Sequence, residues 1–150
     1  MPILAENRRA YHDYEIFAKY EAGIQLKGFE VKSARLGRIN LYGSYVLVRN
    51  NEAWLLNADI PPYQAANILG EYDPNRTRKL LLKKSEIQEL GRKLTEKGLT
   101  LLPLKVYTKG QRHLIKIELG LARGRKTHDK REHIRKKEAE REMGRVLRKY

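Results

Sequence analysis

The segment SYVLVRNNEAWLLNADI, residues 44–60, gives the clearest indication of the fold. Two runs at residues 45–48 and 53–56 are rich in β-branched, aromatic and aliphatic side chains, and an Asn-Asn-Glu triplet at residues 50–52 separates them. Asparagine tolerates the positive φ that tight turns between antiparallel strands require. We therefore predict a β-hairpin here, ended by the two prolines that follow it.

The surrounding sequence extends this hairpin to an antiparallel β domain. Residues 114–119 alternate between apolar and polar side chains, and Lys109-Gly110 marks a turn before them. The further strands that we expect span residues 12–19, 100–107 and 113–121. Short strands joined by turns suit a small closed barrel, so we predict a mainly β fold with helices: an OB-like antiparallel β-barrel with flanking helices and a basic C-terminal tail.

Two helices are expected to flank this barrel. Residues 28–37 are bracketed by glycines and predict a short helix. Residues 73–99 hold the main helical pattern, with Ser85 as a possible cap and Gly98 as a terminator. Residues 1–10 are expected to form a loose arm.

Charge is unevenly distributed along the 150 residues, whose net charge is +14. Residues 121–150 hold 12 of the 32 Lys and Arg and 5 of the 18 Asp and Glu, so one fifth of the chain carries half of the excess charge. This balance indicates a polyanionic partner, with nucleic acid favoured over an anionic membrane. We place the domain boundary so that residues 1–122 form an RNA-binding barrel and residues 123–150 form the tail.

The tail favours a helix that is too charged to be stable alone. Glu, Lys, Arg and Ala dominate from Asp129 onward, and the few apolar residues form one narrow stripe. We expect a tail that is disordered in the free protein and becomes helical against a polyanion. A solvated, charge-balanced helix is one alternative. A basic membrane-surface helix is another, but it would usually carry Trp or Phe, which this stripe lacks.

Several other classes of chemistry are disfavoured. The chain has no cysteine, which excludes disulfides and cysteine-based metal sites. It shows no signal-peptide apolar region and no membrane-spanning run, so we expect a cytoplasmic protein without a membrane partner. His12-Asp13 on a predicted strand and His128-Asp129 on a predicted helix are neighbours whose side chains should diverge, which disfavours a nuclease that uses them. We predict no catalytic residue, metal or cofactor.

Four ordered motifs make the chain resemble a known family. They are NRRAYHDY at residues 7–14, YEAGIQLKGFEVKSARLG at 20–37, DPNRTRKLLL at 73–82 and GLARGRKTHDKR at 120–131. The hairpin segment at 44–60 also fits. In order and spacing these motifs are similar to those of the small protein B family, the SsrA-binding proteins of bacteria.

The resemblance implies a monomeric, non-enzymatic protein of ribosome rescue with an OB-type barrel. Such proteins bind the tRNA-like domain of transfer-messenger RNA and deliver the alanine-charged RNA to ribosomes stalled on messages without a stop codon. Their tail becomes helical on the ribosome, where it occupies the decoding centre and senses the empty mRNA channel. From the residues alone, a ribosomal or ribosome-assembly protein with a basic extension remains the alternative.

The resemblance also assigns contacts with transfer-messenger RNA to the barrel. A barrel face with Glu21 and Leu81 would meet the tRNA-like domain. Lys83 stands where the family often has Asn, which suggests a phosphate contact in place of a base-specific one. The remaining candidates are Asn7, Arg8 and Arg9.

For the tail, the resemblance implies contacts with the ribosome. Gly124 fits a bend, His128 would stack on or bond to ribosomal RNA bases, and Arg135 and Lys136 would bind phosphates along the channel. The complete set of tail candidates is Gly124, Arg125, Lys126, His128, Asp129, Lys130, Arg131, Arg135, Lys136, Val146 and Leu147.

Overall fold

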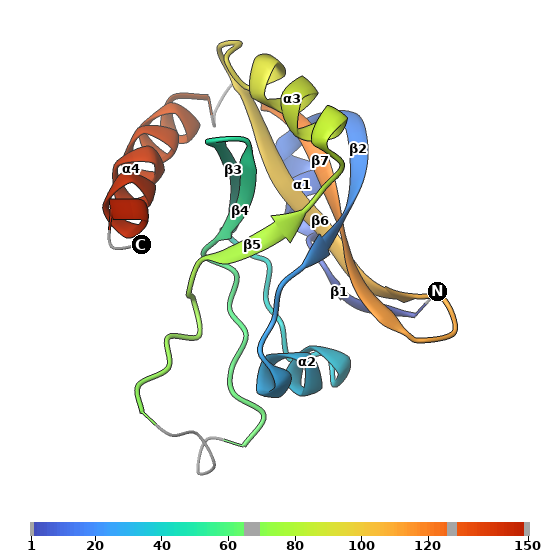
Figure 1. Ribbon diagram of the computed structural model, residues 1–150. Helices are drawn as coiled ribbons and strands as arrows, with labels where there is room; N and C mark the ends of the chain where they lie inside the picture. Colours follow the sequence, from blue (N-terminus) through green and yellow to red (C-terminus); the bar gives the residue numbers. More distant parts are fainter. Residues whose placement is uncertain (1, 65–69, 126–128, 149–150) are drawn as a thin grey trace.

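The computed structural model describes residues 2–64, 70–125 and 129–148, and in the last segment the side chains of residues 135–146. Within these residues lies one seven-stranded antiparallel sheet in the order β1-β6-β3-β4-β5-β2-β7, and an additional β6–β7 pairing closes it into a ring (Figure 1). The strands are β1 (Ile3–Glu6), β2 (Tyr14–Ile24), β3 (Tyr45–Arg49), β4 (Glu52–Leu56), β5 (Arg78–Leu81), β6 (Leu99–Lys109) and β7 (Leu114–Gly124). The helices are α1 (Arg8–Asp13), α2 (Gly28–Arg35), α3 (Lys84–Lys93) and α4 (Asp129–Arg148).

Aliphatic side chains fill the ring. Fully buried members of the main core come from every part of the sheet and include Leu55, Leu80, Leu101, Ile117 and Leu119. The helix α3 adds Leu90, which is also fully buried in this core. Figure 1 places α2 and α3 toward opposite ends of the ring. The predicted mainly β fold with flanking helices is confirmed.

The predicted hairpin is present as β3 and β4. Asn50 and Asn51 adopt φ values of 54° and 59°, which a two-residue turn between twisted strands requires at both central positions. The predicted strands at 100–107 and 113–121 are likewise present as β6 and β7. β7 continues to Gly124, where it pairs with Tyr14, so the barrel extends two residues past residue 122.

The N-terminal residues differ from the loose arm that we predicted. β1 pairs with β6, and α1 follows it directly. Asn7 joins the two, because its backbone N–H donates to the carbonyl of Leu104 at 2.7 Å. The segment therefore forms an additional strand beside the ring, and residues 12–13, which we expected in a strand, end α1.

The helix predicted at residues 73–99 is much shorter than expected. Arg78 and Leu80 are buried in β5 while Leu81 is exposed, so this part of the chain has the period of a strand. α3 begins only at Lys84, and its N-cap residue is Lys83, not Ser85 as predicted. The Lys83 N–H donates to the Glu86 carboxylate at 3.2 Å. Gly98 adopts φ of +84° in the turn before β6.

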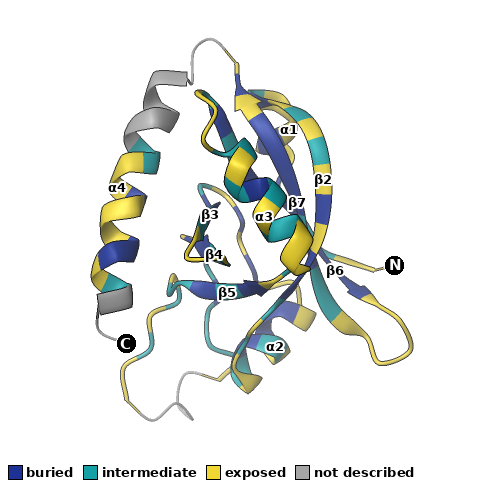
Figure 2. Ribbon diagram, turned by 45° about the horizontal axis from the view of Figure 1, so that its top comes forward, coloured by how far each residue is buried: buried dark blue, intermediate teal, exposed yellow. Residues whose placement is uncertain are grey.

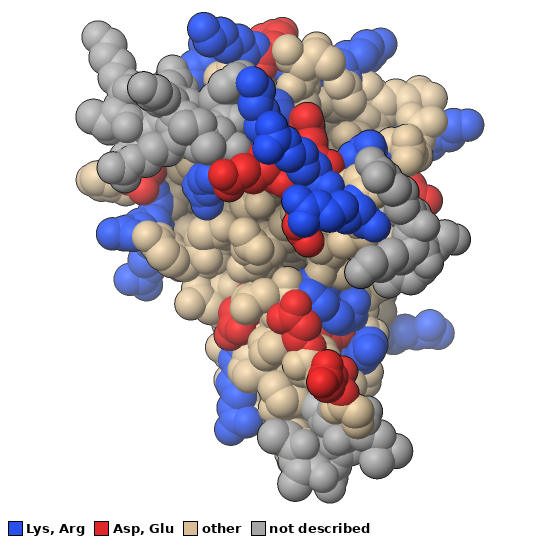
Figure 3. Space-filling view, turned by 90° about the vertical axis from the view of Figure 1, so that its left-hand side faces the viewer, with Lys and Arg blue, Asp and Glu red and all other residues tan. Residues whose placement is uncertain are grey.

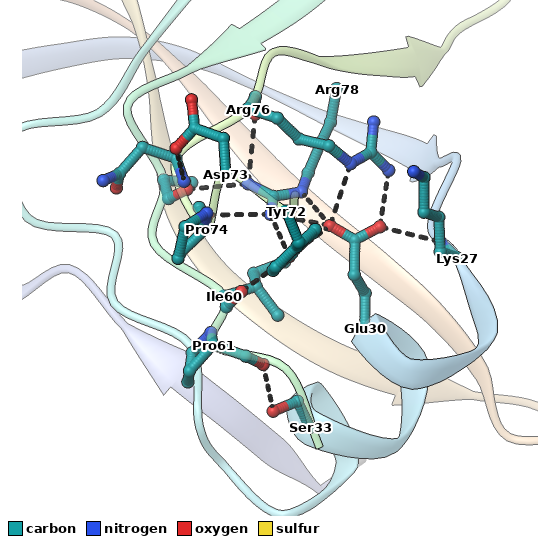
Figure 4. A network of polar contacts seen from close by, with 12 residues as sticks. Lys27, Glu30, Ser33, Ile60, Pro61, Tyr72, Asp73, Pro74, Arg76 and Arg78 are labelled. Atoms are coloured by element: carbon teal, nitrogen blue, oxygen red, sulfur yellow. Dashed lines mark hydrogen bonds and ion pairs between the residues drawn. The ribbon is translucent and has the colours of Figure 1, made fainter. Parts of the chain in front are cut away.

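A buried carboxylate connects α2 to the first residue of β5 and to the chain that leads into this strand (Figure 4). Glu30 of α2 is fully buried and accepts hydrogen bonds from the Lys27 backbone N–H at 2.7 Å and the Arg78 Nε at 2.8 Å. Arg76 forms an ion pair with it, and the Tyr72 hydroxyl lies 2.8 Å from its Oε2. Because every oxygen lone pair faces a donor, the charge is compensated within the protein.

Arg78 is the second fully buried member of this network. Its guanidinium donates to the main-chain carbonyls of Ala58 at 2.7 Å and Pro74 at 2.8 Å. The chain before residue 61 and the chain after residue 72 are thus held against the same side chain. This arrangement fixes where β5 enters the sheet.

The network keeps Glu30 ionised. Burial alone would raise the pKa of this carboxyl, but the hydrogen bonds from Arg76, Lys27, Arg78 and Tyr72 outweigh burial and lower the pKa from 4.5 to about 2. Because the folded-state pKa lies below the unfolded value, the stabilisation is complete above pH 4.5 and is lost as the pH falls toward 2.

We predict that Glu30→Gln lowers the free energy of unfolding at pH 7 by about 3–5 kcal/mol, because it leaves Arg78 buried without its counter-charge. The difference from the wild type should shrink by about 3 kcal/mol between pH 4.5 and pH 2, as Glu30 becomes protonated in the wild type. Urea unfolding at a series of pH values measures both effects. Glu96→Gln, at an exposed glutamate, is the matched control, and a pH-independent difference for Glu30→Gln would contradict the prediction.

Candidate nucleic-acid interface

The first group of predicted RNA-binding residues lies at the start of α1. Asn7 is buried, and its Nδ2 donates to the Pro103 carbonyl at 3.0 Å, so its amide donor holds α1 against β6. Arg8 is exposed and lies 3.7 Å from Glu6. Arg9 stacks over the ring of Tyr42, 4.8 Å from the ring centre, and also bonds to its hydroxyl. The arginines and Tyr42 can meet RNA, whereas Asn7 supports them from below.

A second group lies on the outer surface of β2 and β5. Glu21 accepts hydrogen bonds from the Tyr107 hydroxyl and from Lys109 Nζ at 2.9 Å. These two bonds, the Tyr107 bond first, lower the pKa of the Glu21 carboxyl, so it is a carboxylate at neutral pH. Burial and the Glu21 charge together raise the pKa of Tyr107. An acceptor fixed by two donors is thus presented at the surface.

Leu81 belongs to the same surface. It is 49% exposed on β5 and pairs with Gly23 of β2, two residues beyond Glu21. A Cβ at Gly23 would lie 3.3 Å from the Leu81 Cβ, so the glycine leaves room for this side chain. Lys83 follows Leu81 and is also exposed. The structure therefore brings Glu21 and Leu81 onto one surface, and Lys83 lies two residues beyond Leu81 at the start of α3. This surface combines an acceptor and an apolar contact, with a cation next to it in the sequence.

The tail leaves the barrel beside α1. Gly124 ends β7, and Arg125 donates from its backbone N–H to the Asp13 carbonyl and from its Nε to the His12 carbonyl, both at 3.0 Å. These bonds hold Arg125, the residue that follows β7, on the barrel. Lys126 and His128 lie outside the described residues, as do the side chains of Asp129, Lys130, Arg131 and Leu147.

The described part of α4 lies along the β3–β4 hairpin. Arg135 donates to the Gly43 carbonyl at 3.1 Å and lies over the Tyr45 ring, and Lys136 donates to the Leu94 carbonyl at 2.6 Å. Val146 is half-buried. Figure 2 shows exposed, half-buried and buried residues in the described part of α4, and the buried ones are Ala139, Met143 and Gly144.

The outward face of α4 is strongly charged. Lys137, Arg141 and Arg145 are exposed there, and glutamates lie between them, with Arg145 3.8 Å from Glu142. Figure 3 shows Lys and Arg side chains across this face of the molecule, with Asp and Glu side chains beside them. Such a face suits RNA phosphate better than an apolar surface.

Sequence reasoning missed several residues of these surfaces. Tyr107 and Lys109 orient Glu21, and Tyr42 stacks with Arg9. Sequence reasoning could not find these pairs because the two members of each lie far apart in the sequence. The expectation that His12 and Asp13 diverge is wrong, because at the end of α1 the His12 Nδ1 lies 2.9 Å from the Asp13 carboxylate. Within the described ranges, no group of three His, Asp or Glu could hold a metal ion.

None of the helices in the described part of the chain has the length and hydropathy needed to cross a bilayer. A small β-barrel with exposed cations and a basic extension is typical of RNA-binding proteins. The model of the SmpB protein family matches residues 4–149. The chain therefore belongs to the SmpB protein family.

Individual relatives agree with this assignment. An SsrA-binding protein of Carboxydothermus hydrogenoformans is 56% identical over 146 residues, which cover 97% of this chain and 96% of the relative. One from Microcystis aeruginosa is 50% identical and covers 98% of this chain and 94% of the relative. A chain of the solved structure "tmRNA-SmpB: a journey to the center of the bacterial ribosome" has a TM-score of 0.69 at 48% identity, covering 90% of this chain and 96% of that chain.

We predict that Tyr107→Phe raises the pKa of Glu21 toward its ordinary value, because the mutation removes the hydrogen bond that lowers this pKa most. The pH dependence of the Glu21 carboxyl carbon shift, followed by NMR, measures the effect. Tyr63→Phe is the control, since Tyr63 contacts Lys32 and not Glu21. An unchanged Glu21 titration in Tyr107→Phe would show that this bond does not control the carboxylate.

Proposed function

We propose that this chain binds the tRNA-like domain of transfer-messenger RNA and delivers that RNA to stalled ribosomes for trans-translation. Support comes from membership of the SmpB protein family and from similarity to a chain of a solved structure whose name places tmRNA-SmpB in the bacterial ribosome. The protein acts by binding, in the cytoplasm where ribosomes are found, and not as an enzyme.

The observation that carries this proposal is that one chain presents two separate surfaces suited to RNA. The barrel surface around Glu21, Leu81 and Lys83 is supported by paired strands and is therefore rigid. The second surface is a charged helix joined to the barrel through Arg125. A rigid surface suits one structured RNA, and a long charged helix suits an RNA-walled channel.

On the barrel, each residue contributes a different kind of contact. Leu81 offers an exposed apolar side chain for the face of a base or a ribose. Glu21 accepts hydrogen bonds from base or ribose donors, and Tyr107 and Lys109 fix its position before RNA arrives. Lys83 and the α1 arginines, Arg8 and Arg9, bind phosphates, which makes the affinity depend on salt.

The tail then distinguishes a stalled ribosome from a translating one. In an empty mRNA channel, the residues from Lys126 onward, including His128, Arg131 and Lys136, contact ribosomal RNA along a helix. A channel filled with message excludes the helix because the message already occupies the volume that the helix needs. We propose that the part of the tail beyond Arg125 exchanges between a state off the ribosome and a helical state inside the channel.

We predict that a chain ending at Arg125 retains most of its affinity for transfer-messenger RNA but does not support tagging on stalled ribosomes, because the barrel surface is complete without α4. Ending the chain at Arg125 retains all of β7 and the bonds to residues 12–13. A filter-binding assay measures RNA affinity, and tag addition to a nascent peptide in a reconstituted translation system measures delivery.

Equal loss of RNA affinity and tagging in the truncated chain would contradict this division of labour. The RNA that copurifies with the full chain provides the independent check on the proposed function. We expect one dominant structured species, and assembled ribosomal subunits without transfer-messenger RNA would instead identify a ribosomal or assembly protein.

A further inference from the structure

The β3–β4 hairpin is apolar on both of its faces. Val46, Ala53 and Leu55 point into the main core of the barrel. Opposite residues of an antiparallel pair share a face, and the pairs Tyr45–Leu56 and Leu47–Trp54 form the other face, on the outside of the ring. We call the surface made by these last four residues the outer hairpin face. Covering such a surface with another element removes apolar area from water and is therefore favourable.

α4 provides this cover. Ala139 and Met143 are buried in one cluster with Leu47 and Leu56, and Trp54 packs against that cluster. The two helix residues are four apart, so they lie on one side of the helix, one turn from each other. They belong to the narrow apolar stripe that is evident in the sequence, so the stripe has a partner within the same chain.

The polar contacts of α4 run from cationic side chains to main-chain carbonyls. From the helix, Arg135 donates to Gly43, and Lys136 donates to Leu94 at 2.6 Å and to Leu99 at 3.2 Å. Leu94 is the C-cap of α3, where carbonyls lack helical partners and a cation is favourable.

One contact runs in the opposite direction, from the hairpin to the helix. Arg49 Nη1 donates to the Glu140 carbonyl at 2.8 Å. Gly144 makes room for it, since a Cβ at this position would lie 3.2 Å from Arg49 Nη1. This glycine is buried within a helix that otherwise consists of good helix formers, so its position is explained by the contact with Arg49.

These contacts use the side chains that the proposed function assigns to ribosomal RNA. A guanidinium or ammonium group that donates to a body carbonyl, beneath a helix packed on the barrel, cannot also line an RNA channel away from the barrel. We propose that the outer hairpin face is a resting site for α4, and that RNA competes with this face for Arg135 and Lys136. The inference rests on the proposed function and adds an autoinhibited state to it.

The resting contact is weak enough to be released. Among the described side chains of the helix, at residues 135–146, it buries only two, one of them an alanine. The buried Trp54 indole N–H finds no acceptor among the described residues. An unsatisfied buried donor costs about 1–3 kcal/mol, which offsets much of the gain from burying Met143. The acceptors are neutral carbonyls, so salt should affect the resting contact far less than it affects RNA binding.

Trp54 is the single tryptophan of the chain, so its fluorescence shows whether α4 covers the outer hairpin face. We predict that Met143→Lys shifts its fluorescence emission to longer wavelength, because α4 leaves and water reaches the indole. Arg145→Ala, on the exposed side of the same helix, should leave the emission unchanged. Salt alone should also leave it unchanged, whereas poly(U) RNA at low salt should shift it. Emission that is the same in Met143→Lys and the wild type would overturn the proposal.

A reversible cross-link tests whether release is required. Because the chain has no cysteine, Arg49→Cys with Gly144→Cys creates a unique pair, which a disulfide-containing bis-maleimide can bridge. The cross-linked protein should bind transfer-messenger RNA with unchanged affinity but support tagging at a rate lower by about tenfold or more, and reduction of the linker should restore tagging. Tagging at the full rate by the cross-linked protein would overturn the resting-site proposal. Absence of tagging by the wild type and by the reduced variant would instead refute the proposed function.

Discussion

The rest of the structure depends on the buried ion pair between Glu30 and Arg78. An isolated charge in the interior is strongly unfavourable, so each of these groups is retained only where the other and their neutral partners are in place. The partners come from α2, from the chain around Ala58 and from Tyr72, which lie far apart in the sequence. Satisfying one carboxylate and one guanidinium therefore determines how three segments converge, and the start of β5 is determined with them.

The same constraint positions the barrel surface that we assign to RNA. β5 joins β4 to β2 and thereby completes the ring, and its register sets which side chains face outward. With Arg78 held in the interior, Leu80 also points inward and Leu81 points outward opposite Gly23. A shift of one residue would bury Leu81 and expose Leu80, because the faces of a strand alternate. An interior ion pair therefore controls the position of an exposed leucine.

Sequence reasoning succeeded where the determining interactions are local. The Asn50-Asn51 turn follows from the positive φ that asparagine tolerates, and the alternation in residues 114–119 identifies β7. It failed at residues 78–82, because a run of leucines fits a helix as well as a strand until its partners are known. The motifs at 20–37 and 73–82 do not reveal that Glu30 and Arg78 build the interior while Glu21 and Leu81 form the surface. That distinction is a property of tertiary contacts.

The continuous apolar character of residues 45–48 and 53–56 also indicates that both faces of the hairpin are apolar, which the hairpin prediction did not use. A strand pair that is covered on one face alone alternates, whereas this pair is apolar on both faces, which favours a second layer over it. The narrow stripe of α4 is sufficient to provide that layer but too small to make it permanent. A wider stripe would hold the helix on the barrel permanently. A helix without any apolar stripe would leave Trp54 and Leu47 exposed in the free protein. In the resting-site proposal, the weakness of the stripe is what allows one helix to pack on the barrel and to be released to an RNA partner.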